Sequence, residues 1–272
     1  MSYDGFIGKT ETRTDEVSPR LLTGMAATLG VKRPTILPPL WHWMLFPDWV
    51  QPGELGPDGH PRRGGFLPPV HDLPRRMWAG GRVQLLGPLH EGERVSRTST
   101  ILAVTEKQGG SGRLVFVTVR HVIEGEAGPA VSEEQDIVYR GTEGAATKPA
   151  GPVADRLQPG EGITRTVLPD PVLLFRYSAL TSNGHRIHYD MDYVREVEGY
   201  PGLIVHGPLQ ATWLAGLLAD RPITRFSFRG QRPAFHGAPL TLEARPGGPG
   251  YLLRTLDPSG VACMVAEAET AA

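Results

Sequence analysis

Residues 81–92 read GRVQLLGPLHEG, and residues 225–237 read RFSFRGQRPAFHG. Each stretch starts as a strand candidate and runs into a proline that is followed four residues later by a glycine. A further apolar strand candidate follows each glycine, from Val95 in one case and from Leu240 in the other. The same turn between the same elements indicates an internal repeat, so we expect two domains of similar fold.

The first half of the chain carries four strand candidates that would form an antiparallel meander, because glycine-rich turns separate them. These candidates are residues 80–86, 94–107, 112–125 and 133–141. Residues 11–30 are expected to form a helix, since apolar side chains recur at helical spacing up to Leu29 and Gly30 ends the pattern. Residues 51–76 are rich in turn-forming residues, and we expect an ordered loop or lid there.

The second half repeats this arrangement. A helix is expected to start near Gly207, because apolar residues recur at helical spacing after it. Its apolar face would consist of Leu209, Trp213, Leu214 and Leu217. Residues 171–180 would be extended or a short helix, and the strand candidates are residues 223–235, 239–247, 250–258 and 261–269.

One helix wrapped by a curved antiparallel sheet is the hot-dog layout, so the sequence predicts an α+β fold with two hot-dog domains in tandem. The polar, proline-bearing stretch 141–165 is the best linker candidate. We therefore place the N-terminal domain at residues 1–145 and the C-terminal domain at residues 146–272.

Composition narrows the class of protein. A chain of 272 residues suits two domains of about 100–150 residues each, and its net charge of −1 argues against nucleic acid as a partner. The single cysteine, Cys263, rules out a disulfide within the chain, and its apolar neighbours predict a buried position. No stretch approaches the ~20 apolar residues that cross a bilayer, and the N-terminus lacks the apolar region of a signal peptide. We expect a cytoplasmic protein that does not contact membranes.

The stretch SNGHRIHYD, residues 182–190, holds two histidines three residues apart, with Asn183 before them and Asp190 after them. Because histidine titrates near neutral pH, this group suits acid–base chemistry, a metal site or a structural polar network. A metal site needs a third or fourth ligand. The available residues are Asp58, His60, His121 and His206, but nothing fixes their spacing, so no metal is expected.

Residues 183–190 resemble the hydratase loop of the MaoC-like family, the (R)-specific enoyl-CoA hydratases and hydroxyacyl-thioester dehydratases. That loop usually reads D-x-N-P-(L/I)-H-x-(D/N), so His188 falls on the family's histidine and Asp190 on its last position. Asn183 stands where the family has its aspartate, and an amide cannot act as a carboxylate base. His185 replaces the family's asparagine, and Arg186 replaces its proline.

A second resemblance lies in VHGPLQATWLAGLL, residues 205–218. In this family a short strand leads through a glycine into the central helix, and the N–H of that glycine polarises the thioester carbonyl. Gly207 matches this position. Helix N-termini offer unpaired N–H groups and a positive dipole end, which suits a developing oxyanion.

Segments between residues 35 and 220 also resemble one branch of the family, two-domain bacterial proteins similar to mesaconyl-C4-CoA hydratase, or 3-methylfumaryl-CoA hydratase. The resemblance implies a hydro-lyase that adds or removes water across the double bond of a short enoyl-CoA, most of all 3-methylfumaryl-CoA to give citramalyl-CoA. Coenzyme A is then part of the substrate, no further cofactor is expected, and a homodimer is an open alternative. Other interpretations are a non-catalytic acyl-CoA-binding protein, a thioesterase, and a dehydratase of fatty acid metabolism.

The resemblance implies roles for individual residues. His188 would act as the acid and base that handles water, Asn183 would orient that water, and the Gly207 N–H would bind the thioester oxygen. Arg186 is the first candidate for binding a free carboxylate, with Arg62, Arg63, Arg75 and Arg76 as alternatives if residues 51–76 close over the site. The remaining substrate-binding candidates are His185, Tyr189 and Asp190, and Asp190 could instead cap the next helix. The first domain would form the wall for the acyl tail, with one active site between the two domains.

Overall fold

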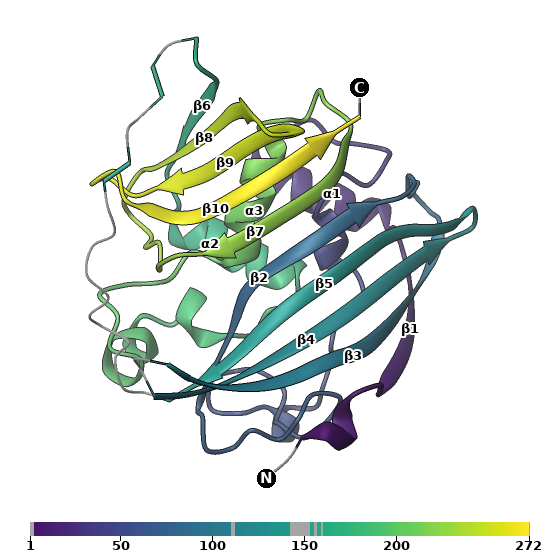
Figure 1. Ribbon diagram of the computed structural model, residues 1–272, viewed down its shortest axis with the longest axis vertical. Helices are drawn as coiled ribbons and strands as arrows, with labels where there is room; N and C mark the ends of the chain where they lie inside the picture. Colours follow the sequence, from purple (N-terminus) through teal and green to yellow (C-terminus); the bar gives the residue numbers. More distant parts are fainter. Residues whose placement is uncertain (1–2, 110–111, 142–152, 155–156, 159, 272) are drawn as a thin grey trace.

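The computed structural model describes residues 3–109, 112–141, 153–154, 157–158 and 160–271. In this part of the chain, strands form an antiparallel ten-stranded sheet in the order β1-β3-β4-β5-β2-β7-β10-β9-β8-β6 (Figure 1). The strands of the first half are β1 (Thr10–Glu16), β2 (Arg75–Leu85), β3 (Arg94–Gly109), β4 (Gly112–Gly125) and β5 (Gly128–Arg140). Those of the second half are β6 (Ile163–Val167), β7 (Ile223–Gly230), β8 (Leu240–Gly247), β9 (Gly250–Leu256) and β10 (Ala262–Thr270).

The strand order is the same from either edge of the sheet. At the centre, β2 pairs with β7 in a register that runs from Gly80 opposite Arg229 to Gln84 opposite Arg225. On both sides the equivalent strands then follow outward, β5 matching β10, β4 matching β9, β3 matching β8, and β1 matching β6. Two copies of one five-stranded unit therefore lie edge to edge, and the predicted α+β tandem hot-dog fold is confirmed.

The repeated turn occupies equivalent places in the two units. Gly92 ends it between β2 and β3, Gly237 ends it between β7 and β8, and both glycines have positive φ, at 80° and 76°. His90 in the first turn forms an isolated bridge with Ile36, as Phe235 in the second does with Ile204. In both halves, the repeated turn therefore pairs with a segment that precedes it in the chain. The expected boundary between residues 145 and 146 lies outside the described residues, so the division at that point stays a prediction.

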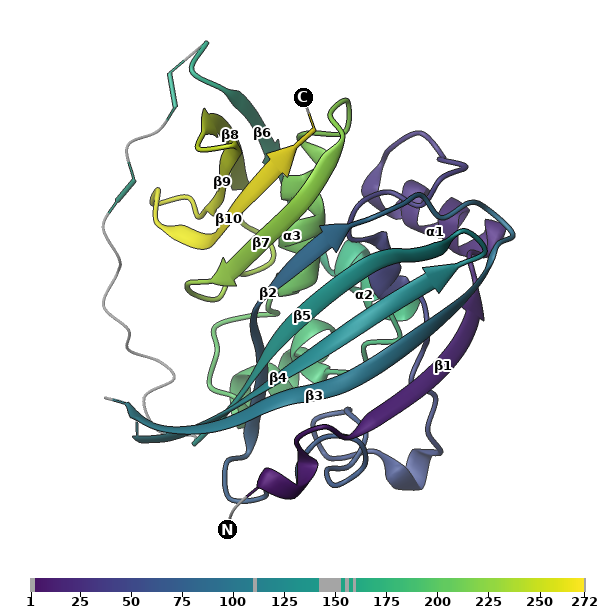
Figure 2. The same ribbon diagram turned by 45° about the vertical axis from the view of Figure 1, so that its right-hand side comes forward.

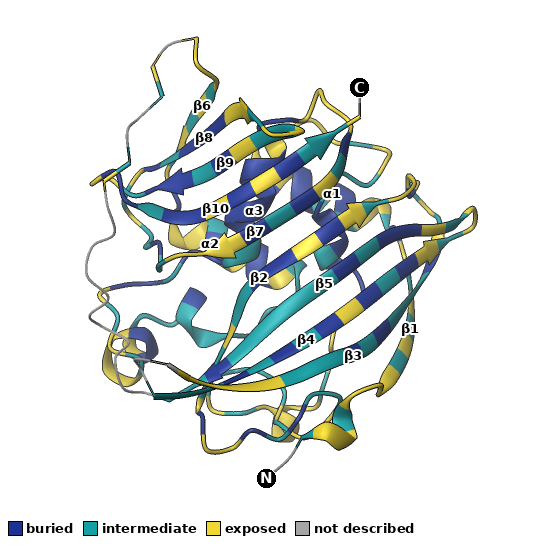
Figure 3. Cartoon of the chain, viewed as in Figure 1, coloured by how far each residue is buried: buried dark blue, intermediate teal, exposed yellow. Residues whose placement is uncertain are grey.

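The helices α1 (Pro19–Leu29), α2 (Pro171–Leu180) and α3 (Gly207–Gly216) lie on one face of the sheet (Figures 1 and 2). Helix α3 contacts β7, β8, β9 and β10, and residues 209–215 are all buried, because an apolar helix held inside a curved sheet has no solvent face (Figure 3). It starts at Gly207 as expected. Residues 171–180, left open by the sequence, form α2. Within the described residues, no helix is long and apolar enough to cross a bilayer.

The helix expected over residues 11–30 is shorter than predicted. Residues Thr10–Glu16 form the edge strand β1, which pairs with β3, and only Pro19–Leu29 are helical. In TETRTDE, half-buried and exposed side chains alternate, a period of two that β-branched threonines favour in strands. Gly30 ends α1 with φ 66°, as its position predicted.

The first half carries no full helix where the second half has α3. After the Ile36 bridge, the chain forms only the 3-10 helix η2 (Trp41–Met44) before it leaves the sheet. Residues 45–74 then form an arch, interrupted by the 3-10 turn η3 (Pro52–Glu54). Val70 and Leu73 anchor this arch in a small hydrophobic cluster on β3, β4 and β5, each burial contributing roughly 1.5–3 kcal/mol. The remaining short elements are η1 (Asp4–Phe6), η4 (Arg186–His188) and the π-helical η5 (Tyr193–Val197).

Candidate active site

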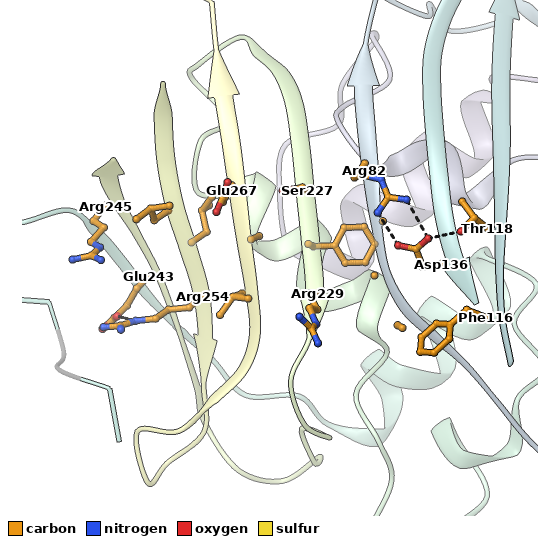
Figure 4. A pocket seen from close by; sticks show the side chains of 18 of the residues that line it. Arg82, Phe116, Thr118, Asp136, Ser227, Arg229, Glu243, Arg245, Arg254 and Glu267 are labelled. Carbon is orange, nitrogen blue, oxygen red and sulfur yellow. Dashed lines mark hydrogen bonds and ion pairs between the residues drawn. The ribbon is translucent and has the colours of Figure 1, made fainter. Parts of the chain in front are cut away.

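The structure has cavities on different parts of the sheet, and they are lined by different kinds of side chain. One of about 970 Å³ lies over its outer face, and Arg82, Asp136 and Arg254 are among the side chains that line it (Figure 4). Arg82 donates to both oxygens of Asp136 at 2.7 and 3.1 Å, and Arg254 donates to Glu243 at 2.6 Å. Its lining, within the described residues, includes no histidine. A second cavity, of about 860 Å³, is lined by His60, His185 and His188, and it is the candidate active site.

His188 stands in this cavity with its ring fixed. Its Nδ1 lies 2.7 Å from the Ile204 carbonyl oxygen, which only accepts, so Nδ1 carries the proton and Nε2 keeps a free lone pair. The ring stacks on His206 with centroids 3.6 Å apart, and His206 Nε2 is 2.8 Å from Ser178 Oγ. Burial lowers the pKa of His188 to about 4, against the hydrogen bond to Ile204. His188 is therefore a neutral base at pH 7.

Asn183 also lines the cavity, just after the end of α2. Its Oδ1 accepts a hydrogen bond from the His185 backbone N–H at 3.0 Å, which leaves the side-chain NH₂ as the group that can face a ligand. The preceding residue, Ser182, has φ 51°, a left-handed conformation that is uncommon outside glycine. Such strain is typical of residues that a functional loop must hold in place.

Gly207 forms the first residue of α3 and lines the same cavity. Its N–H has no acceptor within the helix, because the first N–H groups of any α-helix have none. A Cβ at this position would meet only Met264 Cε at 3.8 Å, so the glycine is not required for packing. The structure thus brings His188, Asn183 and Gly207 together at one cavity, as the sequence predicted, while their catalytic roles stay predictions.

The four predicted substrate-binding residues separate into two groups. His185 lines the cavity, with its ring centroid 5.6 Å from that of His188. Arg186, Tyr189 and Asp190 do not line it. The Tyr189 hydroxyl instead donates to the Gly184 carbonyl at 2.8 Å, which closes the loop on itself.

The prediction that Arg186 binds a substrate carboxylate is not supported by its position. Its Nε and Nη2 donate to the same oxygen of Asp190 at 2.9 and 2.7 Å, and its Nη1 donates to the Pro57 carbonyl at 3.1 Å. The guanidinium also lies over the Tyr193 ring, 4.3 Å from the centroid. The other oxygen of Asp190 accepts from the Tyr193 N–H at 3.0 Å, so Asp190 caps η5, the alternative that the sequence left open. Both side chains hold the loop from outside the cavity.

The sequence indicated only weakly that the arch would contact the hydratase loop at the cavity. Residue 59 must be glycine, because it has φ +87° and a Cβ there would lie 2.0 Å from the Gly184 carbonyl oxygen. The Arg186 N–H donates to the Asp58 carbonyl at 2.9 Å, so arch and hydratase loop join through their backbones. This contact places the His60 ring 4.3 Å from that of His185. The only signal in the sequence was the pair Asp58 and His60 in D-G-H-P, letters that also suit an ordinary turn.

Asp58 and His60 form a polar pair at the cavity. Nδ1 of His60 lies 3.1 Å from Oδ2 of Asp58. Burial is the largest single influence on the pKa of Asp58 and raises it, but the hydrogen bonds from His60 and the electrostatic influence of His60 and His185 together hold that pKa below its usual range. Burial lowers the pKa of His60, with Asp58 opposing the change. At neutral pH the pair therefore consists of a carboxylate and a neutral imidazole.

Asp58, His60 and His185 can also be considered as metal ligands. Each offers one ligand atom, and these atoms lie within 4.8 Å of one another. Two imidazoles and a carboxylate, with an open position toward a cavity, fit the ligand preferences of zinc. The sequence led us to expect no metal, and this stays a prediction. Substitution of these three residues would test it.

Comparisons with known proteins show the family of the chain. A model of the family "hydroxyacyl-thioester dehydratase type 2" matches residues 40–236. The chain belongs to this family. It is also 47% identical, over 97% of its own length and 96% of the other chain, to mesaconyl-C(4)-CoA hydratase of Chloroflexus aurantiacus. The prediction of an enzyme of the hydratase and dehydratase class is confirmed, and so is the resemblance to MaoC-like proteins.

Solved structures support the fold. A MaoC-like dehydratase matches with a TM-score of 0.74 at 13% identity, covering 98% of this chain and 99% of the other. A Mycobacterium tuberculosis protein described as having a double hotdog fold matches with a TM-score of 0.54 at 14% identity, covering 97% and 96%. At this identity the two structures bear on architecture alone, which they share with the chain.

Proposed function

We propose that the protein catalyses the reversible addition of water to 3-methylfumaryl-CoA, giving citramalyl-CoA. The observation that carries this proposal is the shared cavity of His188 and Gly207, a neutral base and an unpaired N–H at a helix start. Identity of 47% to a mesaconyl-C(4)-CoA hydratase supports this choice of substrate. Hydration of a double bond conjugated to a thioester needs these two groups, one for water and one for the carbonyl oxygen.

In the proposed reaction, Nε2 of His188 removes a proton from water as the oxygen attacks the β-carbon. The π electrons move toward the thioester, and the Gly207 N–H stabilises the negative charge that develops on its oxygen. The enolate then collapses, and the protonated His188 returns the proton to the α-carbon. One water is added, no electrons are exchanged with a cofactor, and His188 ends the cycle neutral.

Asn183 would hold the water for this attack. Its side-chain NH₂ can donate to the water oxygen, while its Oδ1 is occupied by the His185 N–H. An amide cannot take the proton, so His188 carries both transfers. Stacking on His206 and the bond to Ile204 keep its ring in a single orientation for both steps.

The test is incubation of the purified protein with 3-methylfumaryl-CoA and, in parallel, crotonyl-CoA. The readouts are the absorbance of the conjugated thioester and the product mass. Loss of absorbance with the gain of one water, faster on the diacid, is expected. Release of free CoA would point to a thioesterase, and no change with either compound would point to an acyl-CoA-binding protein; both results would contradict the proposal.

We also propose that the reaction takes place in the cytoplasm without a cofactor other than the CoA of the substrate. Dialysis against a chelator is expected to leave turnover unchanged, and a loss that zinc restores would overturn this. A homodimer is a further proposal, which the mass in solution would test.

A further inference from the structure

Arg76 is a cavity-lining arginine on β2 without an acidic partner. In the part of the chain that the structure describes, no ion pair joins it to a carboxylate. Its neighbour Arg75 is different, because its Nε lies 3.1 Å from Glu198 Oε2 and its Nη2 donates to the Glu198 carbonyl at 2.8 Å. A half-buried guanidinium with no carboxylate beside it can bind an anion in both of its donor directions, so Arg76 indicates a place for an anion that the protein itself does not supply.

Tyr139 lies directly opposite Arg76 on the paired strand β5, so the two side chains share one face of the sheet. The residue is 0% exposed and lines the cavity, and its hydroxyl oxygen interacts with the Arg76 guanidinium, but no acceptor among the described residues takes the hydroxyl proton. A buried phenol normally has such a partner. The Tyr139 O–H is therefore available to donate to the same anion that Arg76 would bind.

Arg63 adds a fixed positive charge behind this pair. Its guanidinium lies 5.3 Å from the centroid of the Tyr139 ring, and it donates to the carbonyls of Val70, Leu73 and Pro74. The arch thus holds Arg63 in place with three backbone oxygens, none of which neutralises its charge. The result is a corner of the cavity with two guanidinium groups and one free hydroxyl.

The position of this corner suits the acyl group of the proposed substrate. Arg76 is close enough to His60 and His185 for its charge to lower the pKa of both, and burial is the larger cause of each shift. The His185 ring in turn lies 5.6 Å from that of His188. In 3-methylfumaryl-CoA the free carboxylate is attached to the β-carbon, the atom that water attacks. A carboxylate binder must therefore lie near the base, as this corner does.

We propose that Arg76 and Tyr139, with Arg63 behind them, bind a free carboxylate on the acyl chain and so select dicarboxylic acyl thioesters. This inference rests on the proposed function and names its specificity-determining residues. The guanidinium of Arg76 would take both carboxylate oxygens, and the Tyr139 hydroxyl would donate to one of them. Neutralising this charge would also reduce its repulsion of the oxygen that attacks the adjacent carbon.

The test uses binding of saturated analogues, which requires no turnover. Succinyl-CoA carries the carboxylate, whereas butyryl-CoA has a methyl group at that end. Wild-type protein is expected to bind succinyl-CoA more tightly, and Arg76→Ala to weaken succinyl-CoA roughly 10- to 100-fold while butyryl-CoA changes less than about threefold. Arg76→Lys should recover part of the loss, because it restores the charge without the planar fork. Tyr139→Phe should reduce the preference for succinyl-CoA by a smaller factor.

Arg82→Ala is the matched control, since it removes an arginine from the same strand but from the outer face. It should leave both affinities unchanged. Equal weakening of succinyl-CoA, butyryl-CoA and free CoA by Arg76→Ala would overturn the proposal, because it would place Arg76 at the CoA phosphates. Thermal unfolding of each variant confirms that the protein is folded.

The two proposals fail in distinguishable ways. If wild-type protein hydrates neither enoyl-CoA but binds succinyl-CoA through Arg76, the proposed reaction is wrong and the carboxylate site stands. If it hydrates 3-methylfumaryl-CoA and Arg76→Ala affects succinyl-CoA and butyryl-CoA alike, the reaction stands and the carboxylate site is wrong.

Discussion

In the second half of the molecule, residues Gly207–Gly216 form a helix against the sheet, whereas the corresponding place in the first half holds the short turn Trp41–Met44. The strands of the two halves match one for one in order, and this difference lies in the segment between the first and second strand of each unit. In the second half this segment contains the hydratase loop and the helix start. In the first half it contains the arch, which supplies His60 and Arg63 to the same cavity, and Arg76 on the following strand β2 lines that cavity as well. The two copies of the fold thus contribute differently to one cavity, the second with the predicted catalytic residues and the first with other residues that line it.

A buried histidine occurs in η2 of the first half and at the start of α3 in the second half, but its partners differ. In the first half, Nε2 of His42 lies 3.0 Å from Glu133, and Trp43 donates to the other oxygen of that carboxylate at 2.9 Å. In the second half, His206 pairs with a neutral Ser178 and stacks on His188. Glu133 is buried and each of its oxygens is bound by His42 or Trp43, so we expect it to have a structural role. A histidine that supports another histidine belongs to the site.

From this comparison of the two halves we expect the second half to carry out the hydration. His188→Ala is the variant with the largest expected effect. We expect turnover of the enoyl-CoA to fall by about 10³-fold, because no other side chain offers Nε2 at that place. His90→Ala, in the exposed turn of the first half, is the control and should stay near wild type. Steady-state rates of both variants decide the matter, and a His188→Ala rate within tenfold of wild type would remove His188 from the mechanism.

The role of the arch is tested by Gly59→Ala. An added Cβ cannot fit 2.0 Å from the Gly184 carbonyl oxygen, so the arch must move away from the hydratase loop, and kcat/KM should fall about 100-fold. Gly92→Ala is the matched control, since its φ of +80° is similar but nothing lies within 4 Å of the new Cβ. Similar losses of kcat/KM in both variants would show that backbone strain is responsible, and not the loss of contact between the arch and the hydratase loop.

Glu133→Gln is expected to reduce stability without reducing the rate per folded molecule. Removing the buried charge next to His42 should cost about 2 kcal/mol of unfolding free energy, measured by denaturant titration. Burial opposes ionisation of Glu133, but the hydrogen bond from His42 and its charge hold the pKa below the usual value. The wild-type advantage should therefore be present above about pH 4.3 and disappear as pH falls through the folded-state pKa. A change in kcat at neutral pH would contradict the structural assignment.

The smallest effect is expected when the pH is lowered from 8 to 5 and kcat/KM is measured. Burial lowers the pKa of His188 to about 4, so the base stays neutral over this range and kcat/KM should stay level, falling only near pH 4. The same shift affects stability. Since the unfolded histidine binds a proton near pH 6.5, stability is full above that value and is lost as pH falls toward 4. A pH–rate profile with a midpoint near 6.5 would mean that His188 is exposed to water in the working enzyme.

Much of the fold could be predicted from the sequence because its signals are local. The alternation in ITRFSFRG, the apolar helix after Gly207 and the glycines of the repeated turn each lie within a few residues, and each element formed, although the strand expected over residues 223–235 ends at Gly230. The helix over residues 11–30 was too long, because edge strand β1 depends on pairing with β3 more than 80 residues away, as in Thr12 opposite Thr98. Local spacing cannot report that partner.

The site divides in the same way. His188, Asn183 and Gly207 were found from contiguous motifs, and they do share a cavity. What the sequence determined was the pattern of strands, the internal repeat and this set of candidate site residues, since each depends on short segments. Only the tertiary structure decided that Arg186 is bound by Asp190 outside the cavity, and that Arg76 and Tyr139 face each other inside it. The reason is physical: whether an arginine is available to a ligand depends on which carboxylates the fold brings within a few ångströms of it, and strand pairing, which joins distant residues, sets those distances.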